Sequence, residues 1–246
     1  MMKRISVLLF VAMCAGAVWG QEDANTNNSD TNKKMPFEHG SYVQVMNMVG
    51  IGNGEVMEVK IIQTVYFDRW GEWIATEVQS ETNTIDTTKI HKLNILKGNT
   101  YWDIDLIKKT GDVLEVPIEM IKTLTNWENT FTSTGMFGAG MKMKELGEEE
   151  YLGYNCKKTQ IKYAPVEPKN RKQKKKQVKN PSMTMESTTL TYGNLTMKMD
   201  MKLNIEAMNM EMSLKTISIN LDAPPASVFE VPGDVKIESV DWKIEE

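Results

Sequence analysis

The stretch Leu195–Ile205, LTMKMDMKLNI, decides the fold class of this chain. Its even positions are polar, and its odd positions carry Leu195, Met197, Met199, Met201, Leu203 and Ile205. Strict alternation with a period of two residues predicts a β-strand with one buried face and one face in water. At roughly 1.5 to 3 kcal/mol for each side chain, full burial of this face is worth about 10 kcal/mol. We therefore expect it to be covered by core, by a lid or by a ligand.

The alternation continues beyond Ile205 with two changes of phase. After a break near Glu206–Ala207, the apolar positions become Met208, Met210, Met212 and Leu214. They then shift to Ile217, Ile219 and Leu221. A turn followed by a bulge would produce these shifts, so the sequence predicts three segments of an antiparallel meander.

Earlier segments have the same β character and are separated by turn residues. The predicted strands, rich in β-branched and aromatic residues, cover residues 42–49, 56–67, 73–79, 91–96, 100–107 and 152–163. The one convincing helical pattern follows Pro117, where Ile118, Ile121 and Leu124 fall on one stripe. We expect a mainly β protein with one short amphipathic helix.

The N-terminus has the parts of a cleavable export signal. Residues 3–4 are basic, residues 5–18 are apolar, and small residues precede Gln21. The apolar run is shorter than a membrane-spanning helix needs. We expect residues 1–20 to be a signal peptide, residues 21–36 a disordered polar leader, and residues 37–246 a single β-rich domain in the periplasm or outside the cell.

Removal of the signal would leave Cys156 as the only thiol, because Cys14 lies within the signal. A single cysteine forms no internal disulfide, so the fold must depend on packing. Two flanking lysines could lower the pKa of Cys156 and make it reactive; we favour the other interpretation, a small packed hydrophobe in a strand. Cys14 would carry the lipid of a lipoprotein, but the preceding Met13 is not small, which argues against such an anchor.

The formal net charge of −4 conceals a concentration of basic residues in one segment. We predict a loop insertion at residues 165–186, with basic side chains that include Lys169, Arg171, Lys172, Lys174, Lys175 and Lys176. These cations could contact an anionic membrane surface, at about 1 kcal/mol each, or the loop could be a solvated insertion, which we favour. An acidic body with one basic loop is not typical of a nucleic-acid binder.

Signals for catalysis are weak. The two histidines, His39 and His91, stand in unrelated contexts, and the sequence has no serine elbow, zinc-ligand spacing or phosphate-binding loop. We expect a non-enzymatic protein without a cofactor.

The density of methionine leaves three interpretations open. Methionine can fill irregular gaps in a core, or its soft side chains can line a site for an acyl chain or another apolar ligand. In the third interpretation, the Met-x-Met runs bind Cu(I) through their thioethers. We rank copper last, because alternate residues of a strand stand about 7 Å apart, longer than two ligands of one small ion prefer. The predicted contacts of an apolar ligand are Leu195, Met197, Met199, Met201, Leu203, Met208, Met210 and Met212, with Ile118, Ile121 and Leu124 of the helix.

Four segments together resemble a known family. They are Val65–Gly71, Asp103–Leu106 with Lys109–Gly111, Tyr151–Lys158, and Val228–Pro232. In this order they resemble a family of secreted Bacteroidetes proteins of unknown function, related in fold to the LolA-like periplasmic lipoprotein carriers. The long basic insertion and the density of methionine depart from that family.

The resemblance implies an incompletely closed antiparallel β-barrel with the helix across a concave apolar face, where LolA-like carriers shelter acyl chains. From it and the alternating methionines we predict a protein that binds a lipid-like or other apolar ligand on a Met-lined sheet. The alternatives are a structural or envelope-assembly protein with a filled core, and a Cu(I) binder.

Overall fold

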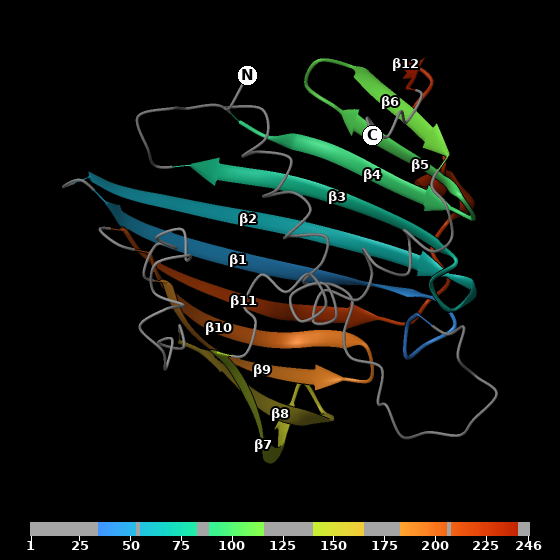
Figure 1. Cartoon of the computed structure of the whole chain (residues 1–246). Helices are drawn as coiled ribbons and strands as arrows, with labels where there is room; N and C mark the ends of the chain where they lie inside the picture. Colours follow the sequence, from blue (N-terminus) through green and yellow to red (C-terminus); the bar gives the residue numbers. More distant parts are fainter. Residues whose placement is uncertain are drawn as a thin grey trace, which may run out of the picture.

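The computed structural model describes residues 34–52, 55–82, 89–115, 140–164, 183–205 and 208–240. Within these ranges, a single 12-stranded sheet has the order β12-β6-β5-β4-β3-β2-β1-β11-β10-β9-β8-β7 (Figure 1). The strands are β1 (Gly40–Gly52), β2 (Glu55–Asp68), β3 (Trp73–Thr82), β4 (His91–Lys97), β5 (Thr100–Asp105), β6 (Thr110–Glu115), β7 (Met141–Tyr151), β8 (Tyr154–Tyr163), β9 (Met183–Tyr192), β10 (Leu195–Ile205), β11 (Met208–Asn220) and β12 (Lys236–Ser239). Two 3₁₀ turns accompany them, η1 (Arg69–Gly71) and η3 (Ala226–Phe229).

The sheet is strongly twisted and is not closed (Figure 1). β7 and β12 are its edges, and all neighbouring strands are antiparallel except β6 and β12, which are parallel. β1 pairs with β11 and so joins the two halves of the chain. The predicted mainly β fold with an open antiparallel sheet is confirmed. The predicted helix after Pro117 lies outside the described residues.

The strands predicted in the first half of the chain are present, and the C-terminal meander needs one correction. β11 is one strand where the alternation predicted two segments. The register between β1 and β11 shifts at Val43/Gln44, and Ile217 is the extra residue of that bulge. A bulge changes the phase of the alternation without ending the strand. The strands β6, β7, β9 and β12 were not predicted, and β9 begins at Met183, inside the range predicted as a loop.

The N-terminal boundary of the fold also differs from the prediction. Residues 21–36 were predicted to be a disordered leader, but Met35 is only 2% exposed and packs with Tyr42, Phe67 and Leu195 in one hydrophobic cluster. The backbone N–H groups of Lys34 and Met35 donate to the carbonyl of Trp70 at 2.9 and 3.1 Å. Gly71 leaves room for this contact, because a Cβ there would lie 3.1 Å from Cγ of Met35.

The C-terminal segment packs on one face of β3, β4 and β5. Phe229 of η3 is buried against Ala75, Ile95 and Ile104, and its ring meets that of Trp73 at 5.9 Å. These residues alternate along their strands with Ile74 and Asn94, which therefore lie on the opposite face of the sheet.

Candidate functional site

One face of β1, β10 and β11 is built mainly of methionine. Directly paired strand residues project on the same side of a sheet, and the pairs Met46↔Leu214, Met48↔Met212, Met199↔Leu214, Met201↔Met212, Leu203↔Met210 and Ile205↔Met208 connect the three strands. We call this surface the methionine face; it comprises Met46, Met48, Met199, Met201, Leu203, Ile205, Met208, Met210, Met212 and Leu214. It continues onto β9 through the pairs Leu203↔Met185 and Ile205↔Met183.

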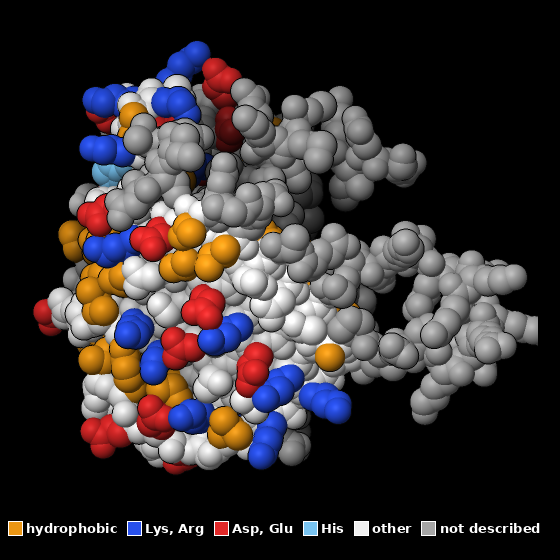
Figure 2. Space-filling model, turned by 90° about the vertical axis from the view of Figure 1, so that its left-hand side faces the viewer, with side chains coloured by type: hydrophobic (Ala, Val, Ile, Leu, Met, Phe, Trp, Pro, Cys, Tyr) orange, Lys and Arg blue, Asp and Glu red, His pale blue; other side chains and the backbone are white. Residues whose placement is uncertain are grey.

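On β10 and β11, burial falls along the methionine face toward one end, whereas Met46 and Met48 of β1 are both 4% exposed. Met199 and Leu214 are buried, Met201, Leu203 and Met210 are half-buried, and Met208 is 41% exposed. The exposed end is the end of the sheet where β1 and β10 finish and β2 and β11 begin. Figure 2 views this end of the molecule and shows hydrophobic side chains among lysine, arginine, aspartate and glutamate side chains. An apolar surface that stays partly open at one end is typical of a binding site.

The structure separates the first two predicted contact residues from the others. A bulge of β10 between Thr196 and Lys198 interrupts its pairing with β9. Leu195 and Met197 are fully buried, and they pack in the cluster that contains Met35, whereas Met199 packs with Met46 and Leu214. The alternation of β10 is therefore uninterrupted only from Met199 to Ile205. Ile118, Ile121 and Leu124, predicted to face this sheet, lie outside the described residues.

A buried polar network lies beside the bulges. Gln44 is fully buried, and its Nε2 donates to the carbonyl of Thr196 at 2.8 Å and to Oγ1 of Thr216 at 3.1 Å. The Thr216 hydroxyl donates to the same Thr196 carbonyl at 3.0 Å, and Nε2 of Gln63 donates to Oε1 of Gln44. The backbone that a bulge leaves unpaired is thus satisfied by side chains.

Hydroxyl groups border the methionine face on the side of β8 and β9. Ser187 is paired in register with Met201, and Thr159 is paired with Thr189, which is paired with Met199. These three hydroxyl residues are buried. Oγ of Ser187 and Oγ1 of Thr159 have no hydrogen-bond partner among the described residues. Buried polar atoms are normally paired, so each unpaired hydroxyl needs a physical explanation.

The same face becomes polar toward β4 and β5. Lys92 forms an ion pair with Asp103 at 3.0 Å, and Nδ2 of Asn94 donates to Tyr101 Oη at 2.9 Å and to Asp103 at 3.1 Å. Burial, together with the charge of Asp103, raises the pKa of Tyr101 well above its usual value. The apolar surface is therefore bordered on this side by charged and hydrogen-bonded side chains.

Cys156 is a packed core residue, as the favoured interpretation predicted. It is fully buried in the cluster with Leu190 and Met197, and its Sγ donates to the carbonyl of Tyr154 at 3.4 Å. Burial raises the pKa of the thiol, which makes the reactive thiolate less abundant at neutral pH.

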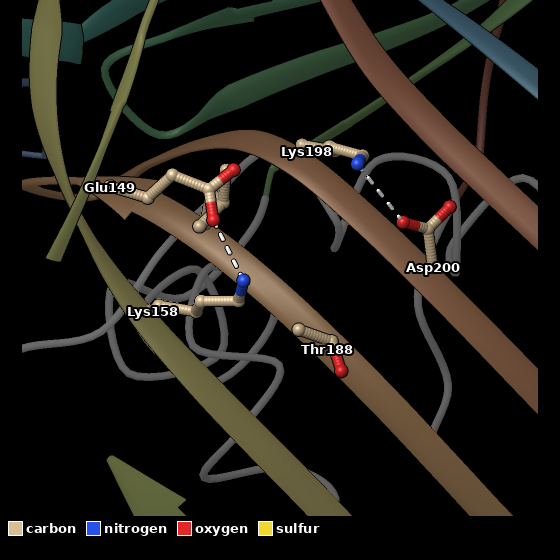
Figure 3. A pocket seen from close by; sticks show the side chains of 6 residues that line it. Glu149, Lys158, Thr188, Lys198 and Asp200 are labelled. Carbon is tan, nitrogen blue, oxygen red and sulfur yellow. Dashed lines mark hydrogen bonds and ion pairs between the residues drawn. The ribbon is translucent and has the colours of Figure 1, made fainter. Parts of the chain in front are cut away.

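A depression lies on the face opposite to the methionine face. It has a volume of about 230 Å³, and its lining residues are Glu149, Lys158, Thr188, Leu190, Lys198 and Asp200 (Figure 3). Lys158 pairs with Glu149 at 2.7 Å and Lys198 with Asp200 at 3.4 Å. Because its charged side chains already pair with each other, this depression lacks the convergent free polar groups of a ligand site.

Two other predicted features, the signal peptide and the cations of the basic loop, cannot be compared with the structure. The signal peptide and the cations Lys169, Arg171, Lys172, Lys174, Lys175 and Lys176 lie outside the described ranges. Within those ranges, three or more His, Cys, Asp or Glu side chains do not gather in a way that could hold a metal ion. A search of the same residues finds no helix long and apolar enough to cross a membrane.

The structure adds residues that the sequence did not single out. Met46 and Met48 of β1, and Met183 and Met185 of β9, join the methionine face or extend it. Each pair alternates with polar residues, Asn47 and Thr184, so the same period-two signal was present. In each of these segments the alternation covers too few residues to be distinguished in the sequence.

Comparisons with known proteins give a coarse likeness only. No family model matches the chain, and a comparison with curated proteins finds no match. Among solved structures, an uncharacterized conserved protein from Thermus thermophilus is 7% identical, with a TM-score of 0.38 over 81% of this chain and 91% of that one. LprF from Mycobacterium bovis is 12% identical, with a TM-score of 0.31 over 80% and 90%. A putative outer membrane lipoprotein-sorting protein domain from Vibrio parahaemolyticus is 10% identical, with a TM-score of 0.29 over 77% and 89%. At these values the family resemblance seen in the sequence stays a prediction.

Proposed function

We propose that this protein binds an apolar or lipid-like ligand on the methionine face, without catalysing a reaction. The observation that carries the proposal is the gradient of burial along β10 and β11, from buried Met199 and Leu214 to exposed Met208. A contiguous apolar surface that continues from the core to an end open to solvent is the kind of patch that marks a ligand-binding groove.

The chemistry of the methionine face suits ligands of variable shape. Methionine side chains have three rotatable bonds and a polarizable sulfur, so they adapt to different apolar surfaces. The border of hydrogen-bonded side chains on β4 and β5 keeps the apolar area bounded, as in ligand sites with a few polar groups at the edge.

Copurification tests the proposal directly. Protein isolated from its natural host is analysed by native mass spectrometry and lipid extraction, and purified protein is titrated with an apolar fluorescent probe. We expect a copurifying lipid-like molecule and saturable uptake of the probe. Absence of both would leave the methionine face as a filled core and would favour a structural or envelope-assembly role.

A pair of matched variants locates the binding surface. Met210 is half-buried on the methionine face, and its neighbour Asn209 is exposed on the opposite face of β11. Met210→Asp places a charge on the apolar surface and should weaken probe binding at least about tenfold, equivalent to roughly 1.4 kcal/mol. Asn209→Asp adds the same charge to the other face and should leave binding unchanged. Equal loss in both variants would show that the probe binds elsewhere.

We also propose that the protein acts in the periplasm or outside the cell after residues 1–20 are removed. The basic, apolar and small-residue segments of the N-terminus support this proposal. N-terminal sequencing of the secreted or periplasmic protein should begin at Gln21, and a chain that retains Met1 would contradict it.

A further inference from the structure

The register of the sheet places three methionines side by side on neighbouring strands. Met48 of β1 is paired with Met212 of β11, and Met212 is paired with Met201 of β10. Directly paired residues have Cβ atoms about 4.5 to 5.5 Å apart, closer than the roughly 7 Å between alternate residues of one strand. Because a methionine side chain has three rotatable bonds, the outer two thioethers can lean toward the central one. The spacing that argued against a metal site along a strand does not apply across strands.

The surroundings of this row favour a soft, singly charged ion. Its neighbours on the methionine face are the row of Met46, Leu214 and Met199 and the row of Gly50, Met210 and Leu203. Charged side chains of these strands, such as the Lys202–Glu211 pair at 2.9 Å, lie on the opposite face. Neutral sulfur ligands in an apolar setting suit Cu(I), whereas Ca²⁺ and Mg²⁺ require oxygen ligands.

The burial of the three methionines and an unpaired hydroxyl on β9 also support a site at this row. Met48 is buried, whereas Met201 and Met212 are half-buried, so the row lies where the covered part of the methionine face meets its accessible part. On β9 the row continues at Ser187, which is 2% exposed and whose Oγ has no hydrogen-bond partner among the described residues. Buried hydroxyls are normally paired, and an ion, an ion-bound water or an ordered water beside Ser187 would supply the missing partner.

We propose that Met48, Met201 and Met212 form a thioether site for a soft monovalent cation, Cu(I) or Ag(I). This binding function goes beyond the proposed apolar ligand. The ion binds in its monovalent state and no electron transfer is involved.

A matched set of leucine variants tests the site. The full chain is titrated anaerobically with Cu(I) in competition with a colorimetric Cu(I) chelator, and in parallel with Ag(I), which is inert to oxidation. We expect one equivalent of tightly bound ion in the unchanged protein. The variant Met48→Leu/Met201→Leu/Met212→Leu keeps the apolar volume and should lose at least about tenfold in affinity. The control Met35→Leu/Met143→Leu removes two thioethers from outside the methionine face and should bind as before.

Cys14 and Cys156 are present in all variants, so any contribution of their thiols is constant. Unchanged affinity in the first variant, or an equal loss in the control, would overturn the proposal. If the triple variant does not fold, as judged by circular dichroism, Met201→Leu alone replaces it, and unchanged binding by that variant would equally overturn the site. Leucine retains the apolar character of the face, so binding of the fluorescent probe should persist in the triple variant, and the two proposals can fail independently.

Discussion

Gln44 provides the sharpest test of the packing around the bulges. Replacement by methionine keeps the approximate volume of the side chain but removes its amide. Two donated hydrogen bonds and one accepted bond are lost, each worth about 1 kcal/mol net. The Thr196 carbonyl keeps the Thr216 hydroxyl as a donor, whereas the amide of Gln63 loses its acceptor. Allowing for the apolar surface that methionine buries, we expect Gln44→Met to lower the free energy of unfolding by about 3 kcal/mol.

Gln63, which donates to Oε1 of Gln44, provides a second test of the same network. Gln63→Met alone leaves Oε1 of Gln44 without its donor and should cost about 1 kcal/mol. In Gln44→Met/Gln63→Met both amides are replaced by apolar groups of similar shape, and Oε1 of Gln63, which has no partner among the described residues, is removed as well. We expect the double variant to lose only about 1 kcal/mol, so that the two changes are coupled by about 3 kcal/mol.

Urea unfolding at equilibrium, with the slope m compared between variants, measures these differences. Gln79→Met on the exposed part of β3 is the control and should change stability by less than about 0.5 kcal/mol. If the free energy of unfolding of the double variant falls by the sum of the two single decreases, to within about 0.5 kcal/mol, the two amides are not coupled and the expected network is refuted.

Three further changes probe the core by other means. Tyr42 is buried with a hydroxyl that lacks a partner among the described residues, so Tyr42→Phe should raise stability by about 1 kcal/mol in thermal and urea unfolding; a loss of that size would reveal a partner. Met199→Ala should cost about 3 kcal/mol because Met199 is buried, whereas Met208→Ala should cost under about 0.5 kcal/mol; equal losses would contradict the gradient of burial. Cys156 should resist iodoacetamide until urea unfolds the protein, since burial raises the pKa of its thiol, and fast alkylation of the folded chain would show an accessible thiolate.

Period-two alternation predicted β10 and the first part of β11 because each has one face covered and one in water. It did not predict β7, where nine consecutive residues, from Lys142 to Glu150, are exposed on both faces. A strand with no covered face has no alternation to preserve. Local patterns also could not show that Met48 pairs with Met212, since this register depends on how β1 and β11 meet across 164 positions of chain. The alternation therefore predicted the strand β10 but not the extent of the methionine face across the sheet, and ligand binding on that face stays a prediction.

An open sheet must expose two edges, and an accessible apolar face adds to the risk of association. The edge strand β7 carries Lys142, Lys144 and the acidic run Glu148–Glu150, and its register with β8 shifts between Glu145 and Gly147. Charged side chains and a bulge both oppose pairing with another strand. The other edge, β12, spans only Lys236–Ser239. A protein that binds an apolar ligand needs an apolar surface that is open at one end. Because both edges are protected in this way, that surface can stay open while an incoming strand finds no edge on which to pair.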